Sequence, residues 1–386
     1  MSRKRLGPST TAIHGVPHRA APGSSVGGTI AQTSTFAFAT DADGDVMYTR
    51  YGNNPNQVDL AERLRLLEGA EAALFTASGM SATALAHLAI LRPGDHLVAS
   101  DWIYGGTRRL FDTEFAKFGI EVTYVRPTEV RAWKKVLRKT TRAVFVESPS
   151  NPHLRVLDLA PLATLCHQRG LALLIDATFA SPINFRPLEH GADVVIHSAT
   201  KYLNGHSDVT AGAIASSTEV IGEARRLLQL WGPALDPHAA WLLARGLKTL
   251  DVRMERHNRS AQAFAEWAAG DKRIAAVHYP GLPAHPDHAL AARILNGFGG
   301  MVGLVVSGGA ARSSAVIRRL KIACHAPSLG GVETLVSEPR LTSHAAMTSA
   351  QRAAQGIPDG FIRVSVGLED VDDLIADFRQ ALKTTG

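Results

Sequence analysis

Short apolar runs separated by longer amphipathic stretches make up the first half of the chain. Five of these runs have the length and composition of buried strands. They lie at residues 72–77, 96–100, 142–147, 171–176 and 192–197. The stretches between them are long enough for helices, so the pattern predicts βαβ units that build a largely parallel sheet. Ligands of such sheets bind at the carboxyl ends of the strands.

Two of the intervening stretches have clear helical signals. Apolar positions over 60–67 repeat with the spacing of one helical face, and a second helix is predicted over 81–91. Ser78, Gly79 and Met80 lie between a strand and this second helix. Because a glycine turn before a helix leaves backbone N–H groups free, these three residues are candidates for binding an anion.

The pattern changes beyond residue 219, where alternation gives way to a long helical stretch. Residues 219–269 are expected to be helical with a single break at Trp231-Gly232-Pro233, and the run 239–247 is expected to bridge two domains. A second, smaller sheet is expected to start at 299–306. Because 386 residues exceed what one core usually supports, we expect a large domain over 51–245 and a smaller α+β domain over 246–386.

The beginning of the chain has no periodic pattern. Residues 1–33 are rich in Gly, Pro, Ser and Thr, which predicts an extended arm, and we place the end of this N-terminal segment at residue 50. An arm of this length on an enzyme is expected to lie on a neighbouring subunit.

Composition narrows the class of protein. Hydrophobic residues at 45% and charged residues at 20% are typical of a globular protein, and no apolar run approaches the ~20 residues of a membrane span. The start of the chain is basic but has no apolar segment behind it, so no secretory signal is predicted. Cys166 and Cys324 lack metal-site spacing and fit a reducing, cytoplasmic environment. The net charge of +6 is dispersed, which favours anionic small molecules over nucleic acid, and we expect neither nucleic-acid nor membrane partners.

The richest chemistry follows the fifth apolar run. Lys201 comes after Ser198 and Thr200, whose hydroxyls suit phosphate oxygens. A lysine amine, with an ordinary pKa of ~10.4, becomes nucleophilic toward a carbonyl when burial or a nearby cation lowers that pKa. This combination suits pyridoxal 5′-phosphate (PLP) held as a Schiff base on Lys201, with Asp176 as the partner of the pyridine nitrogen. Without further context, a Ser-x-Thr-Lys run is more often an ordinary surface segment.

Two runs carry a resemblance to a known family. DATF at 176–179 and SATKYLNGHSD at 198–208 resemble the core of the transsulfuration (Cys/Met metabolism) family of PLP-dependent enzymes, and the likeness extends from about Thr33 to Asp370. The motifs are most similar to those of cystathionine γ-synthase and cystathionine γ-lyase. The resemblance implies an α/β fold of PLP fold-type I, which is aspartate-aminotransferase-like, with the large domain binding PLP. It also implies a homotetramer that is a dimer of dimers, with sites shared between subunits.

The resemblance assigns roles around the cofactor. Lys201 holds PLP and removes the Cα proton of the substrate, Asp176 keeps the ring nitrogen protonated, and Tyr104 lies over the ring and moves protons. Further cofactor contacts are implied for Ser78, Gly79, Met80, Thr178, Ser198 and Thr200 and, from the neighbouring subunit, for Tyr48 and Arg50.

An arginine fork such as that of Arg50 suits a phosphate dianion. The loop after it reads GNNPN at 52–56, one residue longer than the Gly-Asn-Pro-Thr usual in the family, so a changed loop shape is expected.

Substrate contacts are implied for a second group of residues. Arg363 lies within an apolar strand pattern, and a buried arginine must be paired. The resemblance implies that Arg363 binds the α-carboxylate of the substrate. The residues alone are also compatible with a structural ion pair between Arg363 and an acidic side chain. Asn151 matches the family asparagine that binds the cofactor ring oxygen or this carboxylate. Ser328, Tyr48 and Pro327 complete the implied substrate-binding set, and no metal site is expected, because the histidines of the sequence HPDH at 285–288 are predicted to form a surface turn.

The resemblance implies an enzyme that makes or breaks a C–S bond at Cγ, first cystathionine γ-synthase or cystathionine γ-lyase. Methionine γ-lyase and O-acyl-homoserine sulfhydrylase come next, and cystathionine β-lyase last. Leu329 and the GVE run at 331–333 favour the γ side. Pro327 stands where many γ-acting members carry a glutamate for the distal ammonium of cystathionine, and Glu333 and Tyr104 are candidates to compensate. The substrates are cystathionine, an O-acyl-homoserine or a related amino acid, and the sequence leaves the acyl group open.

Two other classes of function remain as alternatives. A non-catalytic regulatory protein on this fold would have no need for Lys201, Asp176, Tyr104 and Arg363 together. An aminotransferase of the same fold usually lacks both the Ser-Ala-Thr-Lys run and the Tyr-x-Arg arm. A visible absorption spectrum would test the first alternative, and an assay for keto-acid formation would test the second.

Overall fold

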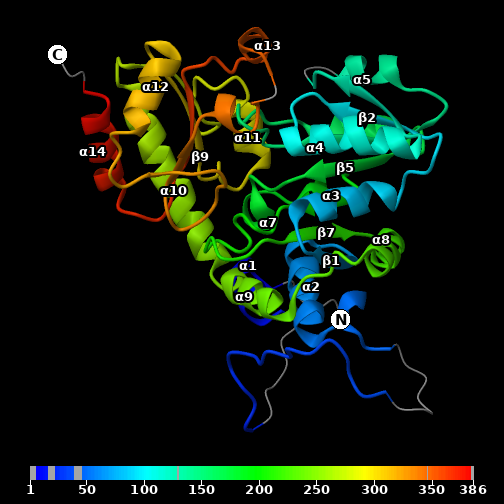
Figure 1. Cartoon of the computed structure of the whole chain (residues 1–386). Coiled ribbons are helices and arrows are strands. Elements are labelled where there is room, and N and C mark those ends of the chain that lie inside the picture. Colours follow the sequence, from blue (N-terminus) through cyan, green and yellow to red (C-terminus); the bar gives the residue numbers. More distant parts are fainter. Residues whose placement is uncertain (1–5, 16–21, 39–45, 128–129, 346, 384–386) are drawn as a thin grey trace.

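Two sheets, each covered by helices, form the body of the molecule (Figure 1). The computed structural model describes residues 6–15, 22–38, 46–127, 130–345 and 347–383. The larger sheet lies toward the right of Figure 1, and the smaller one lies at the upper left. This arrangement confirms the α/β fold with a second, smaller α+β part.

The larger sheet has seven strands in the order β1-β7-β6-β5-β4-β2-β3. The strands are β1 (Ala72–Thr76), β2 (His96–Ser100), β3 (Glu121–Val125), β4 (Thr141–Glu147), β5 (Ala172–Asp176), β6 (Val194–His197) and β7 (Gly212–Ser216). Those from β6 to β3 run parallel, whereas β7 is antiparallel to both β6 and β1. All five predicted strands are present. The sequence reading missed β3, an edge strand, and β7, whose sequence GAIAS has almost no large apolar side chains.

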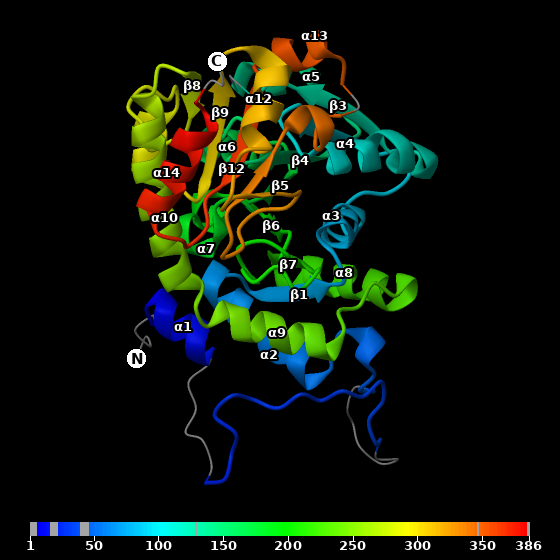
Figure 2. The same ribbon diagram turned by 60° about the vertical axis from the view of Figure 1, so that its left-hand side comes forward.

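Alternate residues of each strand face different helical layers. Val144 and Val146 belong to the core that includes residues of α2 (Pro55–Glu68), α6 (Leu159–His167) and α9 (Pro237–Leu247). Ala143 and Phe145 belong to the core on the other face, with residues of α3 (Gly79–Leu88) and α8 (Thr218–Trp231). Figure 2 shows α2 and α9 side by side next to β1. The sheet is therefore buried on both faces, and its carboxyl edge is left for a ligand.

A single long helix joins the two halves. In α10 (Leu250–Ala269), Leu250 and Met254 belong to the core of the large sheet, while Phe264 and Ala268 belong to the core of the small sheet. The expectation that 239–247 bridges the domains was therefore wrong, because α9 packs only within the large core. The helical stretch also breaks twice, at 232–236 and at 248–249, rather than once.

The smaller sheet has five strands in the order β10-β11-β12-β9-β8. They are β8 (Ile274–His278), β9 (Met301–Val306), β10 (Cys324–His325), β11 (Leu335–Ser337) and β12 (Phe361–Ser365). The sheet thus begins at β8, before the predicted start at 299–306; β8 was missed because it is an edge strand with exposed alanines. Leu374 and Phe378 of α14 (Val371–Ala381) and Val316 of α12 (Gly309–Ile317) fill its core.

The remaining elements are short connections. They are α4 (Gly105–Leu110), α5 (Val130–Val136), α7 (Ser181–Asn184), α11 (His288–Ile294), α13 (Ser349–Ala354), a π-helical turn at Phe111–Phe115 and 3-10 turns at Thr49–Tyr51, Ala116–Phe118, Pro187–His190 and Pro339–Leu341. Residues 285–287 form the expected turn, although His285 itself is buried. In the described residues no helix is long and apolar enough to span a membrane.

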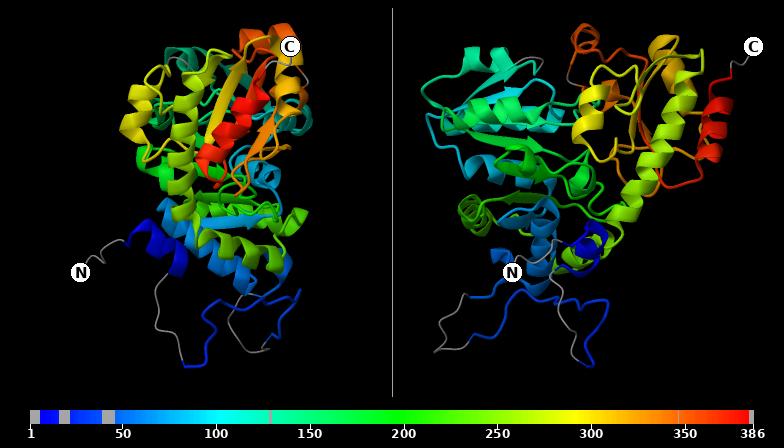
Figure 3. Two further views of the ribbon diagram at one scale, coloured as in Figure 1. Left: turned by 90° about the vertical axis from the view of Figure 1, so that its left-hand side faces the viewer. Right: turned by 180° about the vertical axis from the view of Figure 1, so that it is seen from behind.

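The N-terminal segment is only partly the predicted arm. Residues 8–14 form the helix α1 (Pro8–His14), and Arg63 of α2 donates to the carbonyl oxygens of Ala12 (3.1 Å) and Ile13 (2.6 Å). The expectation of an extended chain throughout 1–33 is therefore wrong for α1, which packs on its own chain. Residues 22–38 contain no helix, are largely exposed and project from the body in Figure 3. Contact of this segment with a neighbouring subunit stays a prediction.

Candidate active site

A cavity of about 1240 Å³ lies at the carboxyl edge of the large sheet, between this sheet and the small one. Its walls come from the ends of β4 and β5, the turn after β6, the start of α3, and two segments of the C-terminal half around residues 327–329 and 342–347. The predicted site residues that line it are Ser78, Gly79, Met80, Tyr104, Asn151, Asp176, Thr178, Ser198, Thr200, Lys201, Pro327, Ser328 and Arg363. Tyr48 and Arg50 do not line it.

Lys201 lies in the turn after β6 and points across the cavity. Its Nζ donates a hydrogen bond to Oγ of Ser328 at 2.6 Å. Burial, with the nearby charge of Arg363, lowers the pKa of the amine to about 8. At pH 7 about a tenth of the amine is therefore neutral and nucleophilic, far more than of an ordinary lysine.

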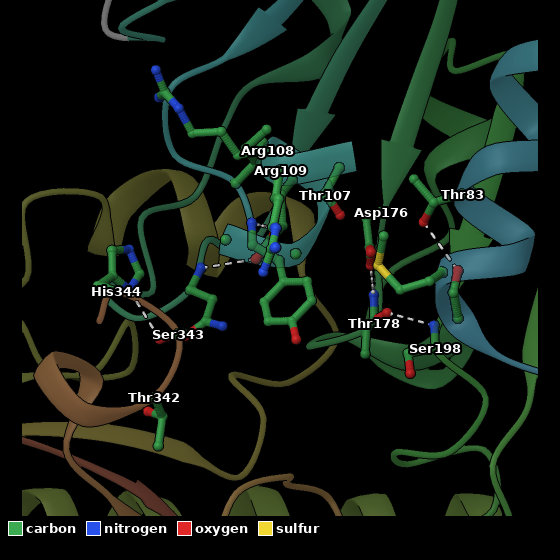
Figure 4. A pocket seen from close by; sticks show the side chains of 18 of the residues that line it. Thr83, Thr107, Arg108, Arg109, Asp176, Thr178, Ser198, Thr342, Ser343 and His344 are labelled. Atoms are coloured by element: carbon green, nitrogen blue, oxygen red, sulfur yellow. Dashed lines mark hydrogen bonds between the residues drawn. The ribbon is translucent and has the colours of Figure 1, made fainter. Parts of the chain in front are cut away.

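Asp176 ends β5 at the floor of the cavity. Its Oδ1 accepts from the backbone N–H of Thr178 at 2.9 Å, and Oγ1 of Thr178 accepts from the N–H of Ser198 at 2.8 Å (Figure 4). Burial raises the pKa of Asp176, whereas the hydrogen bonds from Thr178 oppose this shift. A partly desolvated carboxyl of this kind is well suited to a cationic N–H partner inside the cavity.

The start of α3 forms an anion cradle next to the lysine loop. Ser78 caps the helix by accepting from the N–H of Ser81 at 3.1 Å, and the N–H groups of Gly79 and Met80 have no acceptor within the helix. A Cβ added at Gly79 would lie 2.8 Å from Cβ and Oγ of Ser198. Only glycine lets the helix come this close, so free N–H groups and the Ser198 hydroxyl lie together.

Thr200 contributes differently from what its sequence position suggests. It lines the cavity, but its hydroxyl donates to the carbonyl oxygen of Ala211 at 3.2 Å and accepts from the N–H of Ala211 at 2.9 Å. In this arrangement Thr200 ties the lysine loop to the start of β7, and its hydroxyl proton is already engaged.

Arg363 on β12 is buried against the cavity. It donates to Oδ1 of Asn151 at 3.2 Å and to the carbonyl oxygen of Ser328 at 2.9 Å, and burial lowers its pKa to about 10. Within the described part of the chain no carboxylate forms an ion pair with it, which disfavours the structural ion pair that the sequence left open. A buried guanidinium with only neutral acceptors favours an anionic ligand.

Ser328, which both Lys201 and Arg363 contact, has a backbone φ of 89°. Residues with a Cβ rarely adopt this left-handed conformation, and such strain is concentrated at functional sites. The backbone at Ser328 is thus held where it meets both the lysine and the arginine.

Glu147 is a site residue that the sequence reading missed. It ends β4, and its two oxygens accept from the backbone N–H groups of Tyr104 (2.8 Å) and Asn151 (3.0 Å). Both Glu147 and Tyr104 line the cavity, where Tyr104 is 43% exposed. Its position at the carboxyl end of a strand was the only signal available, because both partners are backbone groups.

Two arginines of α4 were also missed. The guanidinium of Arg108 lies over the ring of Tyr124, 3.9 Å from its centroid, and 3.6 Å from Asp112. Both arginines line the cavity, but Arg109 points in a different direction, and among the described residues its guanidinium has no hydrogen-bond or ion-pair partner (Figure 4). The sequence could not show which of two adjacent arginines is engaged by Asp112 and Tyr124.

Pro327 lines the cavity beside Ser328, as the sequence predicts. Glu333 does not line it: the side chain is exposed, and its carboxylate accepts from the Ser207 hydroxyl at 3.1 Å. The expectation that Glu333 compensates for Pro327 is therefore wrong, since Glu333 lies at the surface and bonds Ser207.

The Tyr-x-Arg segment folds onto its own subunit. Arg50 donates to the carbonyl oxygen of Gln229 at the end of α8, and its guanidinium lies 5.3 Å from the ring centroid of Tyr48 and 5.1 Å from that of Tyr51. Neither Tyr48 nor Arg50 reaches the cavity of this subunit.

The longer loop after Arg50 has a local explanation. Asn54 is the N-cap of α2, where its side chain accepts from Asn56 N–H at 2.9 Å and its own N–H donates to Gln57 at 3.0 Å. The extra residue therefore starts the helix with a capping box.

These residues fit pyridoxal phosphate. An amine of lowered pKa, a buried acid within the same cavity and an anion cradle closed by Gly79 and Ser198 match the aldehyde, the ring nitrogen and the phosphate. An open α/β sheet that carries this site at its carboxyl edge defines the class, a PLP-dependent enzyme.

Comparison with known proteins identifies the family. The chain belongs to the Cys/Met metabolism PLP-dependent enzyme family, whose profile matches residues 9–383. It is 39% identical to L-methionine gamma-lyase of Fusobacterium nucleatum subsp. polymorphum (99% of this chain, 100% of that protein). It is 42% identical to O-succinylhomoserine sulfhydrylase of Pseudomonas aeruginosa (91% of this chain, 89% of that protein).

A solved structure shares the fold throughout. The cystathionine gamma synthase of Xanthomonas oryzae pv. oryzae, in complex with aminoacrylate and cysteine, superposes with a TM-score of 0.93 and 38% sequence identity over 98% of both chains. The cofactor and the class of enzyme expected from the sequence are thereby confirmed.

Proposed function

We propose that this enzyme replaces a substituent at Cγ of an O-acyl-homoserine with cysteine, as a cystathionine γ-synthase does. The observation that carries this choice is Arg109 in the cavity, whose guanidinium has no hydrogen-bond or ion-pair partner among the described residues, combined with Pro327 in place of an acidic residue. An unpaired guanidinium favours a substrate whose distal end is anionic, and a succinyl ester has such a carboxylate.

The side chains of the cavity support a division of roles. Bound PLP supplies the electron sink that stabilises negative charge at Cα and Cβ. Lys201, with its lowered pKa, holds the cofactor and takes the protons from Cα and then Cβ. Asp176, held by the N–H of Thr178, would accept a hydrogen bond from the ring N–H, and the start of α3 with Ser198 would bind the phosphate end.

The substrate is oriented by a second set of residues. Arg363, Asn151 and Ser328 bind the α-carboxylate, since Arg363 is buried with neutral partners only. Tyr104 forms the aromatic wall and moves protons near the leaving group. Pro327 lies beside the far end of the substrate and offers it no charge.

The far end of the cavity favours synthesis over cystathionine cleavage. The distal part of cystathionine carries an ammonium group as well as a carboxylate. The nearby Asp112 is already engaged, by Arg108 at 3.6 Å and by the Tyr124 hydroxyl at 2.5 Å. An acyl-homoserine needs only the anion contact that Arg109 offers. Cleavage of cystathionine or methionine at Cγ is the second candidate.

The working unit in this proposal is at least a homodimer, and a dimer of dimers is the expected homotetramer. The phosphate end of the cavity, around Ser78, Gly79, Ser198 and Thr210, is lined by neutral groups. A dianion there gains from a cation that this subunit does not supply, which supports Arg50 and Tyr48 reaching in from a neighbour. The free thiols Cys166 and Cys324 support a cytoplasmic location.

The proposal is tested by the products and by one arginine. We expect cystathionine from O-succinylhomoserine and cysteine, measured by chromatography. Arg109→Ala should raise KM for the succinyl ester ~10-fold or more, by loss of a charge-assisted hydrogen bond, and change KM for the acetyl ester little. Arg108→Ala is the matched control and should leave the ratio of the two KM values unchanged. Pyruvate and homocysteine from cystathionine as dominant products would contradict the proposal.

A further inference from the structure

Glu147 links two walls of the cavity that come from distant parts of the chain. One oxygen accepts from the N–H of Tyr104, the residue before α4, and the other accepts from the N–H of Asn151. Asn151 in turn accepts from Arg363 at 3.2 Å. A single side chain therefore fixes the backbone beneath the aromatic wall and the backbone beneath the candidate carboxylate site.

The environment of Glu147 is costly for a carboxylate. The side chain is 8% exposed, and it ends β4 in register with Asp176 on β5. Burial and the neighbouring Asp176 carboxyl raise the pKa of Glu147 well above its usual range, and Arg363 and the two N–H groups oppose this only in part. A leucine would avoid these costs, but it would leave the N–H groups of Tyr104 and Asn151 without this acceptor. A carboxyl offers acceptor lone pairs on two oxygens in either protonation state, which both N–H groups require.

We propose that Glu147 is a positioning residue that couples the Tyr104 wall to the Asn151–Arg363 site, so that the ring contact and the carboxylate contact form at a fixed separation. The residue acts through these groups and need not touch the substrate. The expected effect of Glu147 on substrate binding rests on the proposed role of Arg363. The hydrogen bonds that link Tyr104, Glu147 and Asn151 do not depend on which reaction the enzyme catalyses.

The chain offers a matched control in Asp377 of α14. This carboxylate is also buried, and it accepts the backbone N–H groups of Lys321 (2.9 Å), Ile322 (2.9 Å) and Ala323 (3.4 Å). It does not line the cavity. Loss of either carboxylate therefore removes hydrogen bonds to backbone N–H groups. For Glu147 these bonds lie next to the cavity, and for Asp377 they lie away from it.

The first measurement is amide hydrogen exchange in the full-length holoenzyme, resolved to single residues. In Glu147→Gln the amide NH₂ faces one of the two N–H donors, so either Tyr104 or Asn151 should exchange ~10-fold faster, and both should do so in Glu147→Ala. Asp377→Asn and Asp377→Ala should speed exchange at residues 321–323 only. Unchanged exchange at both Tyr104 and Asn151 in Glu147→Ala would overturn the link.

The second measurement compares the affinity of L-alanine with that of ethylamine, which lacks the carboxylate, by the change in cofactor absorbance. In the wild type the carboxylate should strengthen binding, and this preference should fall ~10-fold or more in both Glu147 variants and not in the Asp377 variants. If the preference for L-alanine fell equally in the Glu147 and the Asp377 variants, or fell in neither, the positioning role of Glu147 would be overturned. If the wild type shows no preference for L-alanine, the proposed role of Arg363 fails, while the exchange result still decides the link.

Discussion

The resemblance to the family places both the floor of the cavity and the Tyr-x-Arg segment (Tyr48 and Arg50) in the active site. Within one subunit, however, only the residues of the floor lie in the cavity. On the floor, Lys201 bonds Ser328 across the two domains, Asp176 is held by Thr178, and Arg363 bonds Asn151. In contrast, Arg50 packs on α8 of its own subunit, outside the cavity. In the proposed assignment, one subunit carries the groups for the chemistry at Cα, while the described residues around Ser78, Gly79, Ser198 and Thr210, the proposed phosphate end, are neutral. In our proposal, oligomer formation therefore completes cofactor binding and not the chemistry.

The largest expected effect is at the floor. Lys201→Ala removes both the cofactor attachment and the proton acceptor, so turnover should fall ~10³-fold or more, because a positioned base alone is worth ~10²–10⁴. Steady-state assays and mass spectrometry of the borohydride-reduced protein check this. Lys117→Ala, at an exposed surface position, is the control. Normal turnover in Lys201→Ala would refute the assignment of the floor.

A second change at the floor should separate activity from stability. Asp176→Asn removes the acceptor for the ring N–H and should lower turnover ~10²-fold. Because burial raises the pKa of Asp176, its ionised form opposes folding, so the melting temperature of the cofactor-free variant should equal or exceed that of the wild type. Calorimetry after cofactor removal measures this. A lower melting temperature with normal activity would show that Asp176 is structural.

A smaller effect is expected in the Tyr-x-Arg segment. Arg50→Ala should weaken PLP binding ~10-fold or more through loss of charge-assisted hydrogen bonds to the phosphate. Equilibrium dialysis against free PLP measures the affinity, and kcat at saturating PLP should change less than KM for the cofactor. Arg92→Ala, an exposed arginine paired with Glu223, is the control and should leave the affinity unchanged. An unchanged affinity in Arg50→Ala would remove the segment from the site.

The smallest effect concerns pH. The pKa of Lys201 is lowered to about 8, so below this pH the amine is protonated and cannot attack an aldehyde. The rate at which cofactor-free enzyme takes up PLP should therefore rise with pH and level off above about 8. Stopped-flow absorbance measures this rate. A rise that continues to pH ~10, as for an ordinary lysine, would show that the floor does not desolvate the amine.

Elements whose own residues determine their structure could be predicted from the sequence, whereas elements defined by contacts with distant residues could not. The five apolar strands were found because Val, Ile and Leu concentrate in them, whereas β7, with the sequence GAIAS, is a strand only through its pairing with β1 and β6. The bridging role of α10 was missed because its two ends pack on different cores.

The residues of the candidate site divide in the same way, into those signalled by their own sequence and those defined by distant contacts. Lys201 and Asp176 lie in runs whose composition and resemblance signal them. Glu147 acts through backbone groups of residues 4 and 43 positions away, and the direction of Arg109 depends on how α4 is oriented. The expectation for Glu333 was wrong because a sequence does not show which side chains of a glycine-rich loop face solvent.

Mixed oligomers of Arg50→Ala and Lys201→Ala subunits test most directly whether Arg50 of one subunit and Lys201 of another belong to the same active site. At limiting PLP, Lys201→Ala alone should be inactive, and Arg50→Ala alone should keep about a tenth of the activity or less, because its PLP binding is ~10-fold or more weaker. In a mixed dimer both defects fall in one site, so the other site has an intact Lys201 and an intact Arg50. With co-expressed, differently tagged subunits, we predict recovery of up to about half of the wild-type activity per mixed dimer, because one site of two is intact. Mixed dimers that form but stay inactive would contradict the account.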